Sequence, residues 1–117
     1  MQKVKIFMVS ATQLSFWGSE EKLYERRYIP QMEALAREMG FALAYRREVI
    51  ASAADACAVR DEIRHGDYDL LLIQVSTFAD GGIIAPLAQA GFRLGLWAVP
   101  EITRDGAIPN NSLCGVN

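Results

Sequence analysis

Strand-like and helix-like segments alternate along most of this chain, and this alternation constrains the fold more than any other feature. Short apolar runs at residues 4–9, 41–45, 69–75 and 94–99 are separated by longer stretches with helical spacing or helix caps. The run at 69–75 is almost continuously apolar, which is typical of a strand covered on both faces. Strands that alternate with helices in this way are expected to form a parallel sheet with right-handed crossovers and helices on both sides.

Three stretches are expected to form the connecting helices. The first spans residues 19–39 and ends at Gly40, a residue suited to the left-handed conformation that follows a helix. The second begins after Ser52 as its N-cap, and the third fits residues 82–90. The predicted architecture is a doubly wound, flavodoxin-like (Rossmann-like) three-layer α/β sandwich, with about four mostly parallel strands in the order 2-1-3-4.

Length, composition and charge narrow the class of protein. With 117 residues, 51% of them hydrophobic, the chain is predicted to form a single domain over residues 1–117. A formal charge of −2 provides no excess of Lys and Arg for phosphates or anionic lipids, so neither nucleic acid nor a membrane is an expected partner. The first apolar run is too short for a signal peptide, and Cys57 and Cys114 lack a CxxC spacing, so the expectation is a cytoplasmic protein with free thiols.

The predicted topology also predicts where a ligand binds. In open α/β sheets the site lies beyond the carboxyl ends of the strands, where the winding direction reverses, here between the first and third strands. The loops expected there are residues 10–18 and 76–82, and Glu101 follows the fourth strand nearby. Their hydroxyl and amide groups suit a polyhydroxylated ligand, and aromatic rings could pack against the C–H face of a sugar. The aromatic candidates are Phe16, Trp17, Phe78 and Trp97.

Each candidate also has a structural interpretation. Asp80 is more readily the N-cap of the third helix than a catalytic group, and Gln13 could be a solvated loop residue. Aromatic residues such as Trp97 are more often core or interface anchors than platforms for a sugar. Nucleotide binding through a glycine-rich turn lacks its fingerprint, since the chain has neither GxGxxG nor GxxxxGK[ST].

Catalytic groups are scarce in the sequence. His65 is the only histidine, and it is interpreted as a solvated residue at the end of the second helix, where its charge suits the helix dipole. A Ser-His-Asp triad or a histidine-based metal site therefore cannot be built. Asp80 and Glu101 are two carboxylates at strand ends, too few to hold a metal without further ligands. No catalytic residue and no metal ligand is assigned within the chain.

Three phrases of the sequence resemble the N-terminal region of L-fucose isomerase-like proteins, relatives of the L-fucose and L-arabinose isomerases. They are LLIQVSTFADG at residues 71–81, LWAVPE at 96–101 and NSLCGVN at 111–117. The loop after the first strand, with Gln13 and Leu14, is similar to the Gln-containing loop of arabinose isomerases.

The resemblance implies the opening domain of an aldose–ketose isomerase of carbohydrate metabolism, which uses a divalent metal, commonly manganese. In that family the Glu, Asp and His ligands come from later domains, so the chain is expected to be an N-terminal fragment. The family's active site lies between subunits of a homo-oligomer, where this domain's loops help to cover the sugar bound by a neighbour. The residues predicted to bind substrate are Gln13, Leu14, Phe16, Trp17, Ser76, Thr77, Phe78, Asp80 and Glu101.

One departure from the family pattern leaves the function open between two classes. Ser76 stands where arabinose isomerases have a histidine, and serine cannot shuttle protons near neutral pH as imidazole does. Two classes of function are therefore expected. The chain is either an isomerase domain that contributes substrate contacts or a non-catalytic flavodoxin-like module with a small-molecule binding or regulatory role.

Overall fold

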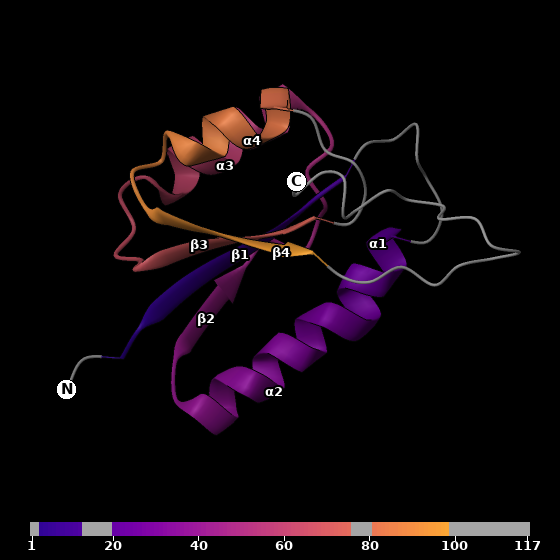
Figure 1. Ribbon diagram of the computed structural model, residues 1–117, viewed down its shortest axis with the longest axis vertical. Coiled ribbons are helices and arrows are strands. Elements are labelled where there is room, and N and C mark those ends of the chain that lie inside the picture. The colour runs from indigo at the N-terminus through magenta and orange to yellow at the C-terminus, as the bar shows by residue number, and fades with distance from the viewer. Residues whose placement is uncertain (1–2, 13–19, 76–80, 99–117) are drawn as a thin grey trace, which may run out of the picture.

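Four strands form one parallel sheet at the centre of the protein. A computed structural model describes residues 3–12, 20–75 and 81–98. The strands are β1 (Lys5–Ala11), β2 (Ala42–Tyr45), β3 (Leu70–Val75) and β4 (Arg93–Ala98), and they lie in the order β2-β1-β3-β4 (Figure 1). All three neighbouring pairs are parallel. The predicted doubly wound, flavodoxin-like α/β fold with strand order 2-1-3-4 is confirmed.

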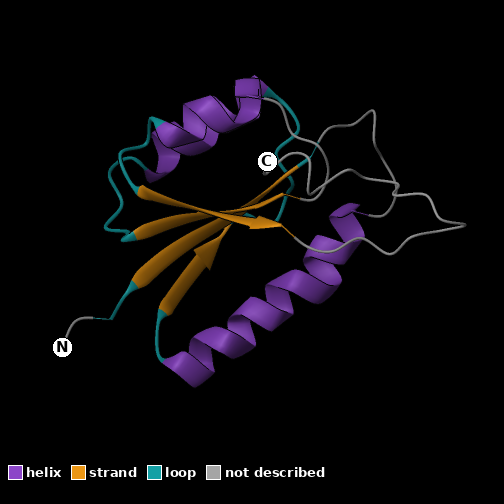
Figure 2. Cartoon of the chain, viewed as in Figure 1, coloured by secondary structure: helices purple, strands orange, loops and turns teal. Residues whose placement is uncertain are grey.

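Helices cover both faces of this sheet. On one face, α1 (Glu20–Leu23), the π-helical turn η2 (Tyr24–Tyr28) and α2 (Ile29–Met39) follow one another without a break and form a single rod. On the other face lie α3 (Ala53–Ile63) and α4 (Gly81–Ala88), which pack against each other (Figures 1 and 2). The central strands are therefore covered on both sides, which explains their nearly continuous apolar sequences.

The alternation of side chains along each strand divides the core into two layers. Phe7, Val9 and Ala11 of β1 join the cluster that packs under α3 and α4, whereas Met8 joins the cluster under η2 and α2. In β3 the same division places Ile73 in the first cluster and Leu72 against the second. A residue's position in its strand thus decides which helical layer it faces.

Two helix-end signals in the sequence are confirmed. Gly40 ends α2 with φ 80°, the left-handed conformation that a side chain would disfavour. Ser52 is the N-cap of α3, and its hydroxyl oxygen accepts a hydrogen bond of 3.1 Å from the backbone N–H of Asp55.

The boundary between β1 and the loop after it differs from the prediction. Ser10 and Ala11, expected in the loop, belong to β1 and are fully buried. Ile50 lies alongside them: its N–H donates to the Ser10 carbonyl at 2.7 Å, and its own carbonyl accepts from the Thr12 N–H at 2.9 Å. This pairing extends the strand through a residue far away in the sequence, so local patterning could not reveal it. Gly81, also expected in a loop, begins α4.

The first helix was predicted at its correct place, and its inward face was predicted in part: Ile29, Met32 and Ala36 fitted the apolar spacing and are buried. Leu23, Leu35 and Met39 fitted the apolar spacing of the sequence, yet they are 37%, 40% and 70% exposed. Tyr24 and Tyr28 are buried instead. The π-helical turn changes the rotation of the residues before it relative to α2, which turns Tyr24 inward and leaves Leu23 exposed. Leu35 and Met39 follow the turn, at the outer margin of the apolar side of α2.

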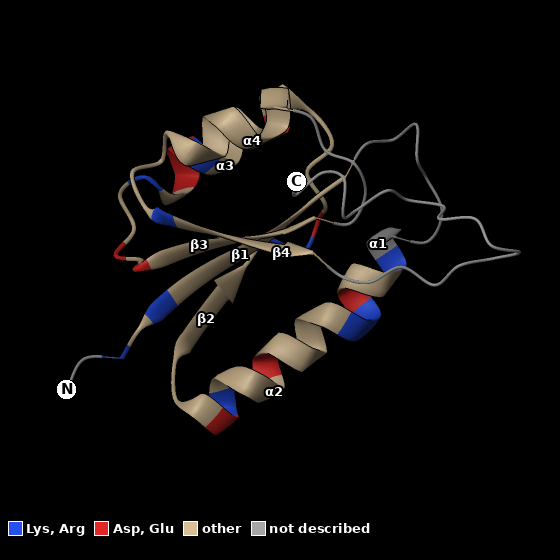
Figure 3. Cartoon of the chain, viewed as in Figure 1, with Lys and Arg blue, Asp and Glu red and all other residues tan. Residues whose placement is uncertain are grey.

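Charged residues keep to the helices, the connecting turns and the starts of strands (Figure 3). Their ion pairs are exposed: Lys5 and Asp67, for example, lie 3.0 Å apart with side chains 47% and 96% exposed, so the pair contributes little stability.

Cys57 of α3 is a half-buried free thiol, and Cys114 lies outside the described residues. Among the helices described, none combines the length and the apolar character needed to cross a membrane.

Candidate functional site

The carboxyl ends of β1 and β3 meet at the point where the sheet changes its winding direction. From β1 the chain leaves through α1, η2 and α2 over one face, and from β3 it leaves through α4 over the opposite face (Figure 1). Ala11 and Val75, the last residues of the two strands, are partners in the ladder. This edge is where doubly wound sheets bind their ligands, because the two connections diverge there.

A buried polar pair lies just below this edge. Ser10 and Gln74 are ladder partners with 0% and 1% exposure, and the Ser10 hydroxyl donates to Gln74 Oε1 at 2.6 Å. Thr12, one position beyond β1, is 4% exposed. Burying such groups costs free energy unless they are hydrogen-bonded, so polar side chains at the ends of otherwise apolar strands indicate a requirement for polarity at this place.

An aromatic pair lies next to Ser10 and Gln74, where the same row of ladder partners crosses to β4. Trp97 is the ladder partner of Gln74, and it packs with the apolar cluster under η2 and α2. Its ring centroid lies 5.4 Å from that of Tyr28, at an interplanar angle of 70°. This edge-to-face contact ties the helical rod to the last strand. Trp97 is half-buried, so the structural interpretation of this residue, as an anchor between helix and sheet, describes its observed position.

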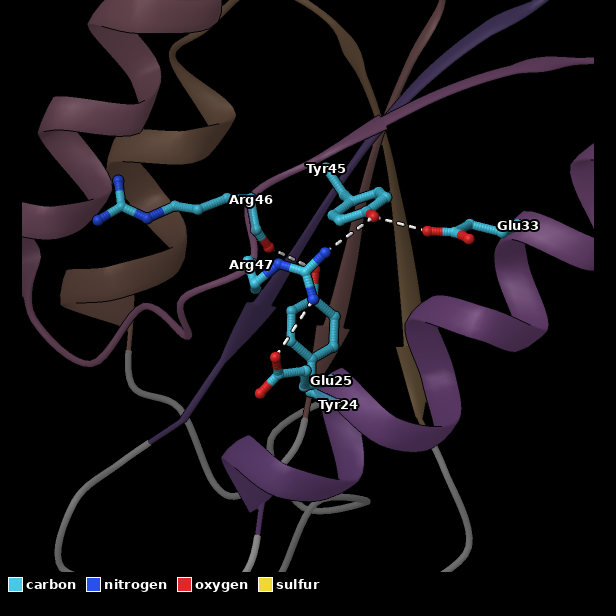
Figure 4. Close-up of polar contacts among 6 residues, drawn as sticks. All are labelled: Tyr24, Glu25, Glu33, Tyr45, Arg46 and Arg47. Atoms are coloured by element: carbon cyan, nitrogen blue, oxygen red, sulfur yellow. Dashed lines mark hydrogen bonds and ion pairs between the residues drawn. The ribbon is translucent and has the colours of Figure 1, made fainter.

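A network of hydrogen bonds ties the same rod to the carboxyl end of β2 (Figure 4). The buried Tyr24 hydroxyl donates to the backbone carbonyl of Arg46 at 2.8 Å, and the Arg47 guanidinium lies 3.3 Å from Glu25 Oε1. Tyr45 at the end of β2 donates to Glu33 Oε1 at 2.6 Å. The rod is thus held at both lateral edges of the sheet, by Tyr24 beside β2 and by the Tyr28 ring beside β4.

The two tyrosine hydroxyls of this network are held in their protonated form. Burial is the main cause that raises the pKa of Tyr24, while the nearby charge of Arg47 lowers it by less. The pKa of Tyr45 is raised chiefly by its hydrogen bond to the Glu33 carboxylate. Neither hydroxyl can therefore serve as a base near neutral pH, and both act as hydrogen-bond donors that position the helix.

The residues that the sequence predicts to bind substrate all lie outside the described residues: Gln13, Leu14, Phe16, Trp17, Ser76, Thr77, Phe78, Asp80 and Glu101. Their convergence on one ligand stays a prediction. In the sequence, the residues from Gln13 to Trp17 follow β1, and those from Ser76 to Asp80 follow β3. These two strands are neighbours, and they end at the same edge of the sheet.

Sequence reasoning chose Trp97 and the loop that includes Ser10, but it missed Gln74 and Tyr28 among the residues that the structure brings together at this edge. Gln74 is the one polar residue within the run 70–75, and that interruption of an apolar strand was a usable signal. Ser10 was assigned to the loop 10–18, whose hydroxyl groups were considered, but its burial in β1 was not predicted. The signal for Tyr28 is its position four residues before Met32, on the inward side of the predicted helix.

The described residues do not supply a manganese site. Within the ranges 3–12, 20–75 and 81–98, no three His, Cys, Asp or Glu side chains are grouped so that they could hold a metal ion. His65 is exposed in the turn after α3 that leads to the start of β3, and so lies toward the amino ends of the strands. Asp80 and Glu101 lie outside the described residues.

Comparison of the sequence with protein-family models and with curated proteins found no match in either set. The likeness to L-fucose isomerase-like proteins therefore rests on the three sequence phrases and the loop after β1. The structural support for a ligand site rests on the geometry of the carboxyl edge alone.

Proposed function

We propose that this chain is the substrate-covering domain of a metal-dependent aldose–ketose isomerase, with the carboxyl edge of β1 and β3 turned toward the sugar. The observation that carries the proposal is the buried pair Ser10 and Gln74, which introduces polar groups where this topology binds ligands. The phrases shared with L-fucose isomerase-like proteins supply the class of ligand.

This domain is expected to recognise the sugar and to exclude water from it. Hydroxyl and carboxamide groups at the edge can exchange hydrogen bonds with sugar hydroxyls, and neighbouring aromatic rings can cover the C–H faces. A divalent metal, proposed to be manganese, would be held by other domains and would polarise the carbonyl and hydroxyl of the sugar. Proton transfer is likewise assigned to groups outside this chain.

The proposal also concerns the oligomeric state of the protein and its location in the cell. Since a covering domain acts on a sugar held by a neighbouring subunit, the protein is proposed to be a homo-oligomer with the sugar at the subunit interface. A cytoplasmic location accompanies this proposal, since the half-buried Cys57 thiol is free and a reducing compartment would keep it so.

The test is an NMR titration of the 117-residue chain with L-fucose and L-arabinose. Backbone amides at the carboxyl edge, Ser10, Thr12 and Gln74, are expected to shift with increasing sugar. Asp67 and Asp69 at the amino edge serve as internal controls, because a sugar bound at the carboxyl edge does not reach them.

The outcomes separate the two classes of function. Saturable shifts confined to the carboxyl edge, seen with sugars and absent with flavin mononucleotide, would support the proposal. Shifts of the same amides with flavin mononucleotide alone would favour a non-catalytic flavodoxin-like binding module instead. Equal responses at both edges, or none with either sugar, would refute sugar binding by this domain.

A further inference from the structure

We infer that Tyr28 is a ligand-contacting residue whose hydroxyl hydrogen-bonds to a hydroxyl group of the bound sugar, while its ring and that of Trp97 border the same place. This inference rests on the proposed function and adds to it a specificity-determining residue on the helical rod. None of the residues assigned from the sequence lies on this helix.

The π-helical turn gives Tyr24 its inward position, whereas Tyr28, four residues before Met32, already follows the inward spacing of α2. In α2 the inward residues are Ile29, Met32 and Ala36. Continuing that spacing backward as an α-helix would place Glu25, four residues before Ile29, on the inward face. The wider turn accommodates one extra residue, so Tyr24 occupies the inward place and Glu25 stays in solvent.

Three tyrosines lie on this face of the sheet, and their hydroxyls are used differently. The Tyr24 hydroxyl bonds to the Arg46 carbonyl, and the Tyr45 hydroxyl bonds to Glu33. Tyr28 is only 9% exposed, yet its hydroxyl forms no hydrogen bond to the described residues. The hydroxyl oxygen is not among the fully buried atoms, so it reaches the surface while the ring is held inside, and it is open to a partner that is not part of the described chain.

The surroundings of Tyr28 indicate the class of that partner. Its ring contacts Trp97, which is the ladder partner of Gln74, and Gln74 bonds to Ser10. Aromatic surface thus adjoins a polar row at the carboxyl edge, which matches the mixed C–H and hydroxyl surface of a sugar. A phenol can both donate and accept, so it tolerates either orientation of a sugar hydroxyl.

The test compares Tyr28→Phe with Tyr68→Phe in sugar titrations. Tyr28→Phe removes only the hydroxyl and retains the ring that contacts Trp97. Tyr68 is the matched control, because it also makes edge-to-face contacts, with Phe7 and Phe92, but lies near the amino edge. Affinity is measured by NMR, melting temperature by circular dichroism, and the indole N–H resonance of Trp97 reports on the ring pair.

The expected result is a sugar affinity about 2- to 10-fold weaker in Tyr28→Phe, the effect of one lost neutral hydrogen bond. The melting temperature and the unliganded Trp97 resonance should match those of the wild type, and Tyr68→Phe should bind normally. Normal affinity in Tyr28→Phe, with a wild type that binds sugar, would overturn this inference and leave the proposed function intact. A wild type that binds no sugar would overturn both.

Discussion

Deletion of Arg26 tests why the long helical rod contains a wide turn. Arg26 is exposed, and it forms no ion pair with the described residues. Its removal leaves Tyr24 and Ile29 four positions apart, so a continuous α-helix could carry both of them inward. If side-chain pattern were the only reason for the π-helical turn, this deletion would cost little.

Pro30 adds a second reason, and it sets the magnitude. Pro30 now sits in the first turn of α2, directly after the wide turn, where its missing N–H has little consequence. In a continuous helix it would lie in the interior, lacking a hydrogen bond to the carbonyl four residues before it and crowding that carbonyl, at a cost of about 3 kcal/mol. We therefore expect the deletion alone to lower the free energy of unfolding by about 3 kcal/mol.

The assay is urea unfolding of four proteins: the wild type, the deletion, Pro30→Ala, and the combination. Pro30→Ala alone should change stability by less than about 1 kcal/mol, because the α-helical register would still bury Glu25 in place of Tyr24. The combination should regain the wild-type value, a coupling of about 3 kcal/mol. Strictly additive effects, or a deletion as stable as the wild type, would refute the role assigned to Pro30.

Four further predictions concern the hydrogen bonds of Tyr24 and Tyr45 and the candidate site. Tyr24→Phe should lower the free energy of unfolding by about 1–2 kcal/mol, and Tyr45→Phe by less, because the Tyr24 bond is the more buried one; urea unfolding of both variants measures this. Since the folded pKa of Tyr24 lies above the ordinary 10.0, its contribution is complete below pH 10 and lost at higher pH, so stability should fall above pH 10 less steeply in Tyr24→Phe than in the wild type. In the proposed isomerase assembly, Gln13→Ala is expected to weaken sugar turnover without a change in melting temperature, whereas equal loss of both would show Gln13 to be structural. The 117-residue chain by itself should neither interconvert aldose and ketose nor bind manganese tightly, which sugar incubation and calorimetry check; turnover, or micromolar metal affinity, would contradict this.

The sequence by itself predicted the architecture to a large extent. Helical spacing, the Ser52 cap and the left-handed Gly40 are local signals, readable within a few residues, and the structure confirms them. Alternating strands and helices then leave few topologies, because crossovers between parallel strands are right-handed. The strand order and the position of the winding reversal follow from that small set.

The candidate site was predictable only as a location. Topology predicted the edge of β1 and β3 as the place for a ligand, but of the residues that the structure describes there, Gln74 and Tyr28 were not chosen from the sequence, whereas Trp97 was. Ser10 and Gln74 are 64 positions apart, and only their pairing in neighbouring strands makes them a buried polar unit. No spacing rule along the chain connects two such residues.

What the tertiary structure alone decided is the inward face at the start of the first helix. Its apolar spacing favoured Leu23 and Leu35, yet Tyr24 and Tyr28 are buried: the Tyr24 hydroxyl bonds to the Arg46 carbonyl just after β2, and the Tyr28 ring contacts Trp97 of β4. Helical periodicity assumes one rotation per residue, and a π-helical turn breaks that assumption. The sequence determined that a helix forms over this stretch, whereas contacts with distant strands determined its rotation, since burial is a property of the assembled layers and not of the segment.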